Sequence, residues 1–257
     1  MAPASLFELP AKNERWIVLV GLALVAAMGL FLTLRVGDRV MILSMSGETD
    51  PTYPALLFFM WWAMMMAMML PSAAPAILTF AAISRKFSVS TKTAAPIPFF
   101  AAGYAAIWTG FSIVAVVLQL LLSDKIMLSM MMAVTSSVVG GGLLIAAGIY
   151  QLSPLKSACL NKCQAPLMFL ARNWRKGSLG AFQMGFEHGI YCLGCCWVLM
   201  GLLFYGGVME LRWIVGLAIY VAIEKLIPAG NILSRSAGLL LIGWGLWTVW
   251  QAAYLVS

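Results

Sequence analysis

The sequence contains very little charge. Asp, Glu, Lys and Arg make up 10% of its 257 residues, whereas 63% of the residues are hydrophobic. This composition excludes an ordinary soluble domain and indicates a polytopic membrane protein. Acidic residues are fewer than basic residues, 9 against 16. We assign the excess of basic residues to loops at a membrane surface, with no nucleic-acid partner.

Histidine is scarcer still, with one copy, and cysteine occurs five times. A single histidine excludes a His-rich zinc hydrolase centre, and no paired carboxylates lie within an apolar run. No lysine followed by serine or threonine comes after the glycines at 140–142, so these glycines do not form a phosphate-binding loop and are expected to pack helices together. The sequence therefore assigns no catalytic residue.

Apolar runs of about 20 residues predict an all-α fold, in which residues 1–257 form a single integral membrane domain of about seven spans. The segment before the first run lacks a cleavage pattern, so the first helix is expected to remain as an anchor. The sixth run is short and could be a half-helix, and Glu224 and Lys225 at its end are expected to form an interfacial ion pair. The expected spans are 16–34, 55–82, 95–122, 127–150, 180–207, 210–226 and 235–254.

The basic residues predict the orientation of these spans. With the N-terminus inside, all Lys and Arg residues except Arg35, Arg39, Lys125 and Arg212 fall on the cytoplasmic side. This asymmetry predicts a multi-pass protein of the bacterial inner membrane with its N-terminus inside and its C-terminus outside. Residues 35–54 would then form a polar surface loop on the outer side.

The fifth apolar run has the richest set of metal ligands. It contains the segment GFEHGIYCLGCCWVLM, residues 185–200, in which the only histidine lies beside three cysteines. At about 100° per residue, one helical stripe would carry an imidazole, two thiols and a thioether, with a third thiol at its edge. The stripe consists of Met184, His188, Cys192 and Cys195, and Cys196 lies at its edge.

Thiolates and imidazole together favour a soft or borderline metal, either Cu(I) or, as the alternative, zinc. One helix cannot complete such a site, so further ligands are expected from elsewhere. The competing interpretation is that the cysteines pack as small apolar residues and that His188 hydrogen-bonds to a neighbouring helix. Glu187 points about 100° away from His188, so we expect it to support a ligand or pair with another helix rather than bind the same ion.

Methionines provide a second group of soft ligands. Met60, Met64 and Met68 recur every four residues, on one face of the second expected span, and a further cluster occupies residues 127–132. Thioethers could accept a cuprous ion without the cost of burying anionic ligands. The alternative is that these flexible side chains only fill the core.

The other two cysteines, Cys159 and Cys163, lie four residues apart in a basic inside loop. Two prolines bracket this segment, which predicts a short helix with both thiols on one side. Lys156 and Lys162 are expected to favour the metal-binding thiolate form. A pair of reduced cytoplasmic thiols without a metal is the alternative. The third apolar run carries aromatic residues without a ligand set, and we assign it a scaffolding role.

Four segments together resemble a bacterial family described as predicted metal-binding integral membrane proteins, a domain of unknown function. They are MWWAMMMAMMLPSAAP, YQLSPLKSACLNKC, GFEHGIYCLGCCWVLM and EKLIP, and the resemblance covers about residues 60–250. The resemblance implies a metal site at His188, Cys192, Cys195 and Cys196, with Cys159 and Cys163 nearby. It also implies a small soluble partner protein encoded beside the gene, and the presence of copper-dependent oxidation genes nearby favours copper.

Three functions remain open from the sequence. The first is copper handling, in which the protein binds Cu(I) in the bilayer and delivers it to a membrane cuproenzyme. The second is a membrane subunit of a copper-dependent oxidase or monooxygenase acting on an apolar substrate, although such centres usually require several histidines. The third is thiol–disulfide exchange, because Cys192 and Cys195 form a C-x-x-C unit. The expected position of that unit on the reducing side disfavours the third function.

Overall fold

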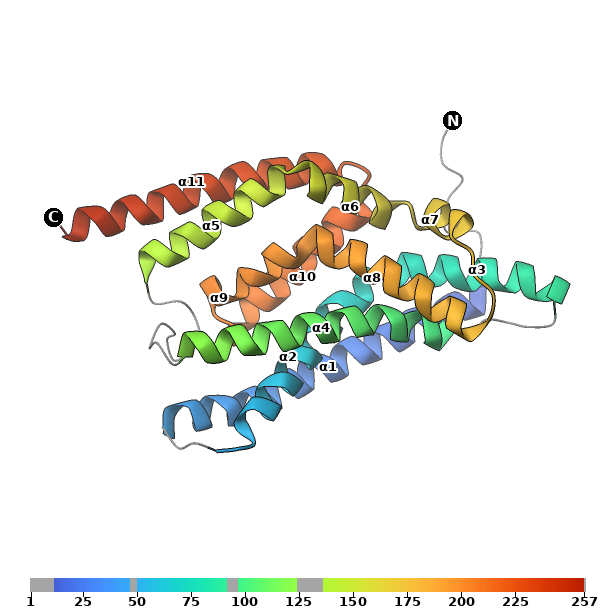
Figure 1. The fold of residues 1–257 in the computed structure, drawn as a ribbon, viewed down its shortest axis with the longest axis horizontal. Coiled ribbons are helices and arrows are strands. Elements are labelled where there is room, and N and C mark those ends of the chain that lie inside the picture. The colour runs from blue at the N-terminus through green and yellow to red at the C-terminus, as the bar shows by residue number, and fades with distance from the viewer. Residues whose placement is uncertain (1–11, 47–49, 92–96, 124–135, 257) are drawn as a thin grey trace.

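The computed structural model describes residues 12–46, 50–91, 97–123 and 136–256, and its regular elements in these ranges are helices, as Figure 1 shows. The all-α prediction is therefore confirmed. The helices are α1 (Lys12–Ser46), α2 (Tyr53–Ser72), α3 (Ala74–Thr91), α4 (Ile97–Ser123), α5 (Ser137–Leu152), α6 (Pro154–Gln164), α7 (Pro166–Arg172), α8 (Gly177–Gly201), α9 (Leu203–Gly206), α10 (Leu211–Leu226) and α11 (Gly230–Val256).

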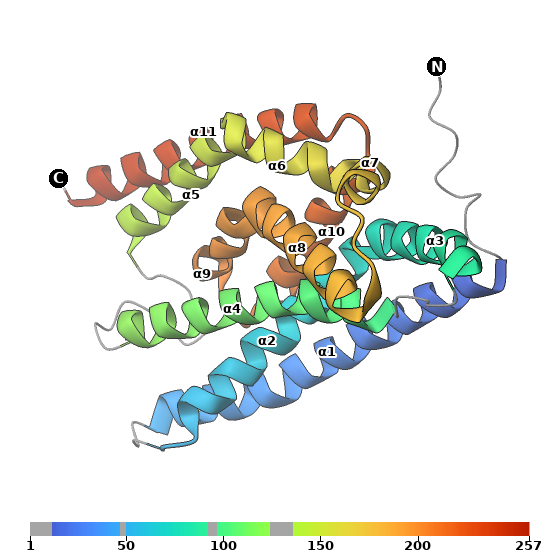
Figure 2. The same ribbon diagram turned by 45° about the vertical axis from the view of Figure 1, so that its right-hand side comes forward.

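The long helices run along the longest axis of the molecule (Figure 1). Helices α5 and α11 pack together along one edge, and α1 packs against α2 along the opposite edge. Helix α8 packs on α4 between these two pairs, and α10 contacts α2, α6, α8 and α11 from inside the bundle. Figure 2 shows the same central position of α8 and α10 after rotation. Ligands on α8 are therefore enclosed by helices from both halves of the chain.

Within the described residues, five helical segments are long and apolar enough to cross a membrane, and the number rises to six if α5 and α6, which meet at 63°, form one broken span. This result is roughly consistent with the prediction of about seven. Helix α10 accounts for much of the difference, since its 16 residues are short for a complete span. The five segments are Val18–Ser44, Tyr53–Ser72, Ile97–Ser123, Gly177–Gly206 and Gly230–Tyr254.

The second expected span, 55–82, is interrupted. Helix α2 ends at Ser72 and α3 starts at Ala74, whereas residues 55–82 were expected to form one continuous span. Pro71 and Pro75 explain the break, because proline has no amide hydrogen to donate and its ring collides with the preceding turn. The amide of Ala73 still donates to the carbonyls of Met69 and Leu70, which closes the end of α2. The break lies beside the candidate site, because Pro71, Ser72, Ala73 and Ala74 all line the same cavity.

Two expected boundaries are wrong. The outer loop was expected from residue 35, but α1 continues to Ser46, because no proline interrupts it and apolar side chains such as Val36 and Val40 continue the helical pattern. The fourth span was expected from residue 127, whereas α5 starts at Ser137, with Ser136 as its N-cap. The methionine cluster at 127–132 lies outside the described residues.

Glycines bring α4 and α8 into direct backbone contact. A methyl group added at Gly103 of α4 would overlap the carbonyl oxygen of Phe182, and one added at Gly185 of α8 would overlap the carbonyl oxygen of Phe100. The packing role expected for the glycines of α5 is seen at Gly141, whose added methyl would lie 2.9 Å from the Gly245 carbonyl oxygen of α11. Small residues thus set the spacing of both helix pairs.

Candidate metal site

The metal-ligand stripe predicted from the sequence lies on α8 and faces the interior. His188, Cys192, Cys195 and Met184 are buried together, and so is Cys196. All of them except the histidine belong to the main apolar core of the bundle. The α8 stripe is therefore shielded from lipid and from solvent, as a site for a soft metal requires.

His188 sits in an aromatic box. The rings of Phe100, Tyr104 and Phe169 surround it, with centroids 6.2, 6.0 and 5.9 Å from the imidazole centroid. The side chain is 4% exposed, and its Nδ1 finds no hydrogen-bond partner within the described ranges. These residues thus offer no hydrogen bond to Nδ1. A buried polar atom without a partner costs free energy unless a ligand satisfies it.

Cys192 has the most polar surroundings of the α8 cysteines. Its Sγ lies 2.9 Å from the Lys225 Nζ, which donates to it, and 3.0 Å from the Tyr104 hydroxyl. Lys225 also donates to the Ser72 Oγ at 3.1 Å, and Ser72 and Tyr104 both donate to the carbonyl of Met69. These contacts form a closed ring of polar groups that links α8 and α10 to the break between α2 and α3.

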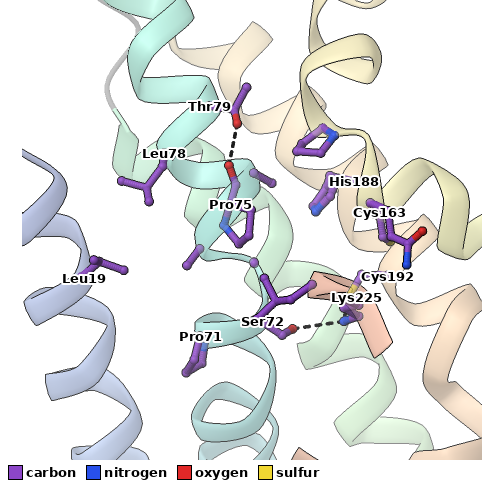
Figure 3. A pocket seen from close by; sticks show the side chains of 16 residues that line it. Leu19, Pro71, Ser72, Pro75, Leu78, Thr79, Cys163, His188, Cys192 and Lys225 are labelled. Atoms are coloured by element: carbon purple, nitrogen blue, oxygen red, sulfur yellow. Dashed lines mark hydrogen bonds between the residues drawn. The ribbon is translucent and has the colours of Figure 1, made fainter. Parts of the chain in front are cut away.

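A cavity of about 460 Å³ opens at this point. We call it the His188 cavity. Figure 3 shows His188, Cys163, Cys192 and Lys225 on one side of it and the α2–α3 break on the other. Most of the remaining wall is apolar and comes from α1, α3 and the end of α10. The structure thus brings one imidazole and two thiols to a single apolar chamber.

Cys195 and Cys196 are oriented differently. Their thiols donate to the backbone carbonyl of Cys192 at 3.1 and 3.0 Å, one helical turn away. Neither residue lines the His188 cavity. Both are satisfied as packed thiols, so they lie behind Cys192 and would need a rotamer change to reach a metal bound in the chamber.

Cys159 and Cys163 lie on α6, which confirms the short helix that the prolines predicted. Cys163 lines the His188 cavity, and its thiol is a neighbour of the Cys195 thiol. Cys159 packs against the backbone of α8, where a methyl group added at Gly194 would lie 2.8 Å from its sulfur. Both cysteines of α6 therefore approach the same stretch of α8, around Gly194 and Cys195.

The five cysteines are all free thiols. Within the described residues, no group of three or more His, Cys, Asp or Glu side chains is arranged to hold a metal ion. The α8 geometry explains this, since Cys195 and Cys196 turn back to a carbonyl while Cys192 is engaged by Lys225.

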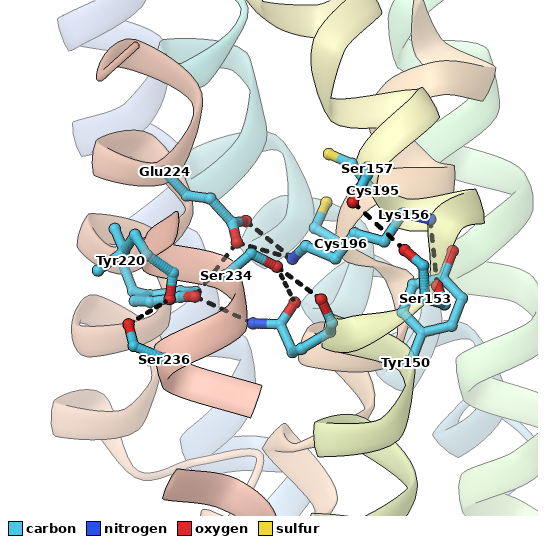
Figure 4. Close-up of polar contacts among 12 residues, drawn as sticks. Tyr150, Ser153, Lys156, Ser157, Cys195, Cys196, Tyr220, Glu224, Ser234 and Ser236 are labelled. Atoms are coloured by element: carbon cyan, nitrogen blue, oxygen red, sulfur yellow. Dashed lines mark hydrogen bonds and ion pairs between the residues drawn. The ribbon is translucent and has the colours of Figure 1, made fainter. Parts of the chain in front are cut away.

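The expectation of an interfacial ion pair between Glu224 and Lys225 is wrong. Glu224 instead pairs with Lys156 of α6, whose Nζ lies 2.8 and 2.9 Å from its two carboxylate oxygens, and both side chains are fully buried (Figure 4). Adjacent residues on a helix point about 100° apart, so Lys225 reaches Cys192 on another side. Lys156 is therefore paired with Glu224, whereas the sequence analysis expected it to favour the thiolate form of the α6 cysteines. The Nζ of Lys162 lies 4.0 Å from the Tyr191 ring centroid.

Glu187 does not line the His188 cavity. Its carboxylate pairs with Arg175, just before α8, at 2.6 Å, and the two side chains are 29% and 44% exposed. The partner of Glu187 is thus a loop residue, whereas the sequence predicted a role beside a ligand or a pair with another helix. Support of a metal ligand by Glu187 is not seen.

Met60, Met64 and Met68 are all buried along α2, toward the interior of the bundle. Met65, Met66 and Met69 are buried as well, so burial alone does not single out the predicted stripe. The stripe nevertheless leads toward the His188 cavity, because α2 ends there at Pro71 and Ser72.

The scaffolding role assigned to the third apolar run was too limited. This run is α4, and its Tyr104 contacts Cys192 and stacks near His188. Lys225 and Ser72 were likewise missed as site residues. The usable signals were a tyrosine in an otherwise apolar helix and a lysine at the end of a short one, both of which need a buried partner.

The fold and this chamber define a class: an all-helical bundle with several helices apolar enough to cross a membrane and an enclosed set of soft metal ligands. A family model described as PpoB2, copper chaperone, matches residues 58–248. This match includes the α2–α3 break, α6, α8 and α10, and the chain belongs to this copper chaperone family. No curated protein and no solved structure matches the chain.

Proposed function

We propose that this copper chaperone binds Cu(I) in the His188 cavity, with Cys192 and His188 as the principal ligands. The observation that carries the proposal is the unpartnered Nδ1 of a buried histidine beside two thiols in one apolar chamber. Copper is the cargo here rather than a resident cofactor. Thiolate and imidazole are ligands that cuprous copper accepts, and the lack of carboxylates in the wall disfavours harder ions.

The remaining candidates have supporting roles in this proposal. Cys163 of α6 is the third ligand in the cavity. It would pass Cu(I) between the cavity and the side of the bundle that carries Cys159. Cys195, Cys196 and Met184 lie within the core behind Cys192. They can receive the ion by rotamer changes rather than by movement of a helix.

We infer that the chain acts as one integral domain in the bacterial inner membrane, with the start of α1 on the cytoplasmic side. The long apolar helices and the one-sided distribution of basic residues support this placement. The copper it carries would be delivered to a membrane cuproenzyme, directly or through a small soluble partner protein.

Anaerobic titration of the detergent-purified protein with Cu(I), in competition with bicinchoninate, tests the proposal. We expect one tightly bound Cu(I) in the unaltered protein, and its loss in Cys192→Ser and in His188→Phe. Phenylalanine preserves the aromatic packing of the box, so His188→Phe removes the ligand with little change in volume. Cys159→Ser is the matched control, because Cys159 does not line the cavity.

All variants must keep the helix content and the elution volume of the unaltered protein for the comparison to hold. Full Cu(I) binding by folded Cys192→Ser would remove Cys192 from the site. Equal loss of Cu(I) in Cys159→Ser would instead place the principal site on α6.

A further inference from the structure

Lys225 brings a positive charge into the apolar interior of the bundle. The residue is 8% exposed, lies in the last turn of α10 and lines the His188 cavity. Its neighbour Glu224 is already neutralised by Lys156, as Figure 4 shows. The Lys225 ammonium is directed instead at the sulfur of Cys192, 2.9 Å away, and at the hydroxyl of Ser72. Its nearest group able to carry negative charge is thus the proposed copper ligand.

We propose that Lys225 is a built-in cation that occupies Cys192 in the copper-free protein and is displaced when Cu(I) binds. The proposal rests on the proposed function and adds a determinant of copper affinity and release. Lys225 is thus a positioning residue that acts through Cys192 and does not itself ligate copper.

Charge balance in the chamber supports the exchange. A thiolate paired with one ammonium is neutral, and a thiolate paired with one cuprous ion is also neutral. A thiolate with both cations beside it carries a net positive charge, and inside the bundle the two cations repel each other more strongly than in water. Cu(I) and the Lys225 ammonium therefore compete for the same sulfur.

The ring of contacts around Lys225 allows the ammonium to leave Cys192 without losing every partner. Ser72 still accepts from it at the end of α2, beside the backbone freed by the α2–α3 break. The ammonium donates to both groups in the copper-free protein, and the lysine stem is flexible, so a small rotation can break the contact with Cys192 and keep the one with Ser72. When copper leaves, the ammonium returns to the sulfur and neutralises it. This return lowers the cost of release, which a chaperone needs in order to deliver its cargo.

The test compares Cu(I) affinity and the rate of Cu(I) transfer to bicinchoninate in the unaltered protein and in Lys225→Met. Removing the competing cation should tighten Cu(I) binding by roughly tenfold or more and slow transfer by a similar factor. Lys225→Arg retains the charge and should keep the original affinity. Lys162→Met is the matched control, because it removes a lysine whose ammonium lies over the Tyr191 ring, outside the cavity lining.

A background lacking the sulfur separates this role from a general effect on folding. In Cys192→Ser, which is expected to lose its Cu(I), the added Lys225→Met change should not restore binding, because the shared partner is gone. If Lys225→Met does not fold, Lys225→Gln carries the same test, since its amide is uncharged but can still donate hydrogen bonds.

The outcomes distinguish the two proposals. An unaltered protein that binds no Cu(I) overturns the proposed function. An unaltered protein that binds Cu(I), together with a neutral Lys225 variant of equal or weaker affinity, overturns the displacement proposal alone. Tighter binding in Lys225→Arg as well would also overturn it, because the effect would then not follow the charge.

Discussion

The buried ion pair between Lys156 and Glu224 provides the sharpest test of how this bundle is held together. The change is Glu224→Gln, which keeps the shape of the side chain and removes its charge. In the unaltered protein the carboxylate receives both Nζ contacts within 2.9 Å, and Tyr220 donates to it at 3.2 Å. The pair connects α6, which carries Cys163, to α10, which carries Lys225.

The expected magnitude follows from burial. Both side chains are fully buried, so the substitution leaves an ammonium without a counter-charge inside the bundle. Breaking such a pair on one side costs about 3–5 kcal/mol of unfolding free energy. Since each 1.4 kcal/mol is about a tenfold change in an equilibrium constant, we expect the unfolded fraction to rise by more than about a hundredfold.

Reversible denaturation in mixed detergent micelles, followed by tryptophan fluorescence, measures this cost. The matched control is Glu187→Gln, which breaks the partly exposed pair with Arg175 and should cost at most about 1 kcal/mol. The double change Lys156→Met with Glu224→Leu removes both charges and should recover most of the loss. A Glu224→Gln cost no larger than that of Glu187→Gln would refute the reasoning.

Two further predictions concern packing and loading. Gly103→Ala should destabilise the protein by several kcal/mol in the same assay, because the added methyl group overlaps a carbonyl oxygen of α8. Gly110→Ala on the same helix is the control: its methyl group meets nothing within 4 Å, so the change should be neutral. Replacing Met60, Met64 and Met68 with leucine keeps the buried volume, so folding should be unchanged. The rate of Cu(I) loading, measured by stopped flow, should fall because the thioether ligands are lost. An unchanged loading rate would leave these methionines as core residues only.

Much of the fold follows from local sequence. Apolar runs of the length of a span predict the long helices, and the second run is interrupted between Pro71 and Pro75. The sequence pattern does not show how the helix ends or continues at these two prolines. Whether two prolines kink a helix or divide it depends on what neighbouring helices do with the freed backbone groups. Here Tyr104 donates to the Met69 carbonyl, which stabilises the end of α2.

The candidate site was predictable only where its residues share one helix. His188 and Cys192 stand one turn apart, so helical periodicity brings them together. Lys225 and Tyr104 come from 33 and 88 residues away in the sequence, and no local period connects them to Cys192. Periodicity also placed Cys195 and Cys196 among the ligands, because it gives the direction of a side chain but not the nearby carbonyl to which each thiol donates.

The position of the chamber follows from two interruptions that meet inside the bundle. Helix α2 ends at Ser72 because of its prolines, and α10 ends at Leu226 after only 16 residues. Each end brings a polar group to the same place, and the contact between Ser72 and Lys225 joins them. Ser72 is the last residue of α2, and Lys225 lies in the last turn of α10, so both polar side chains lie beside an interruption. The proposed exchange of Lys225 for Cu(I) at Cys192 would therefore take place where two helices end.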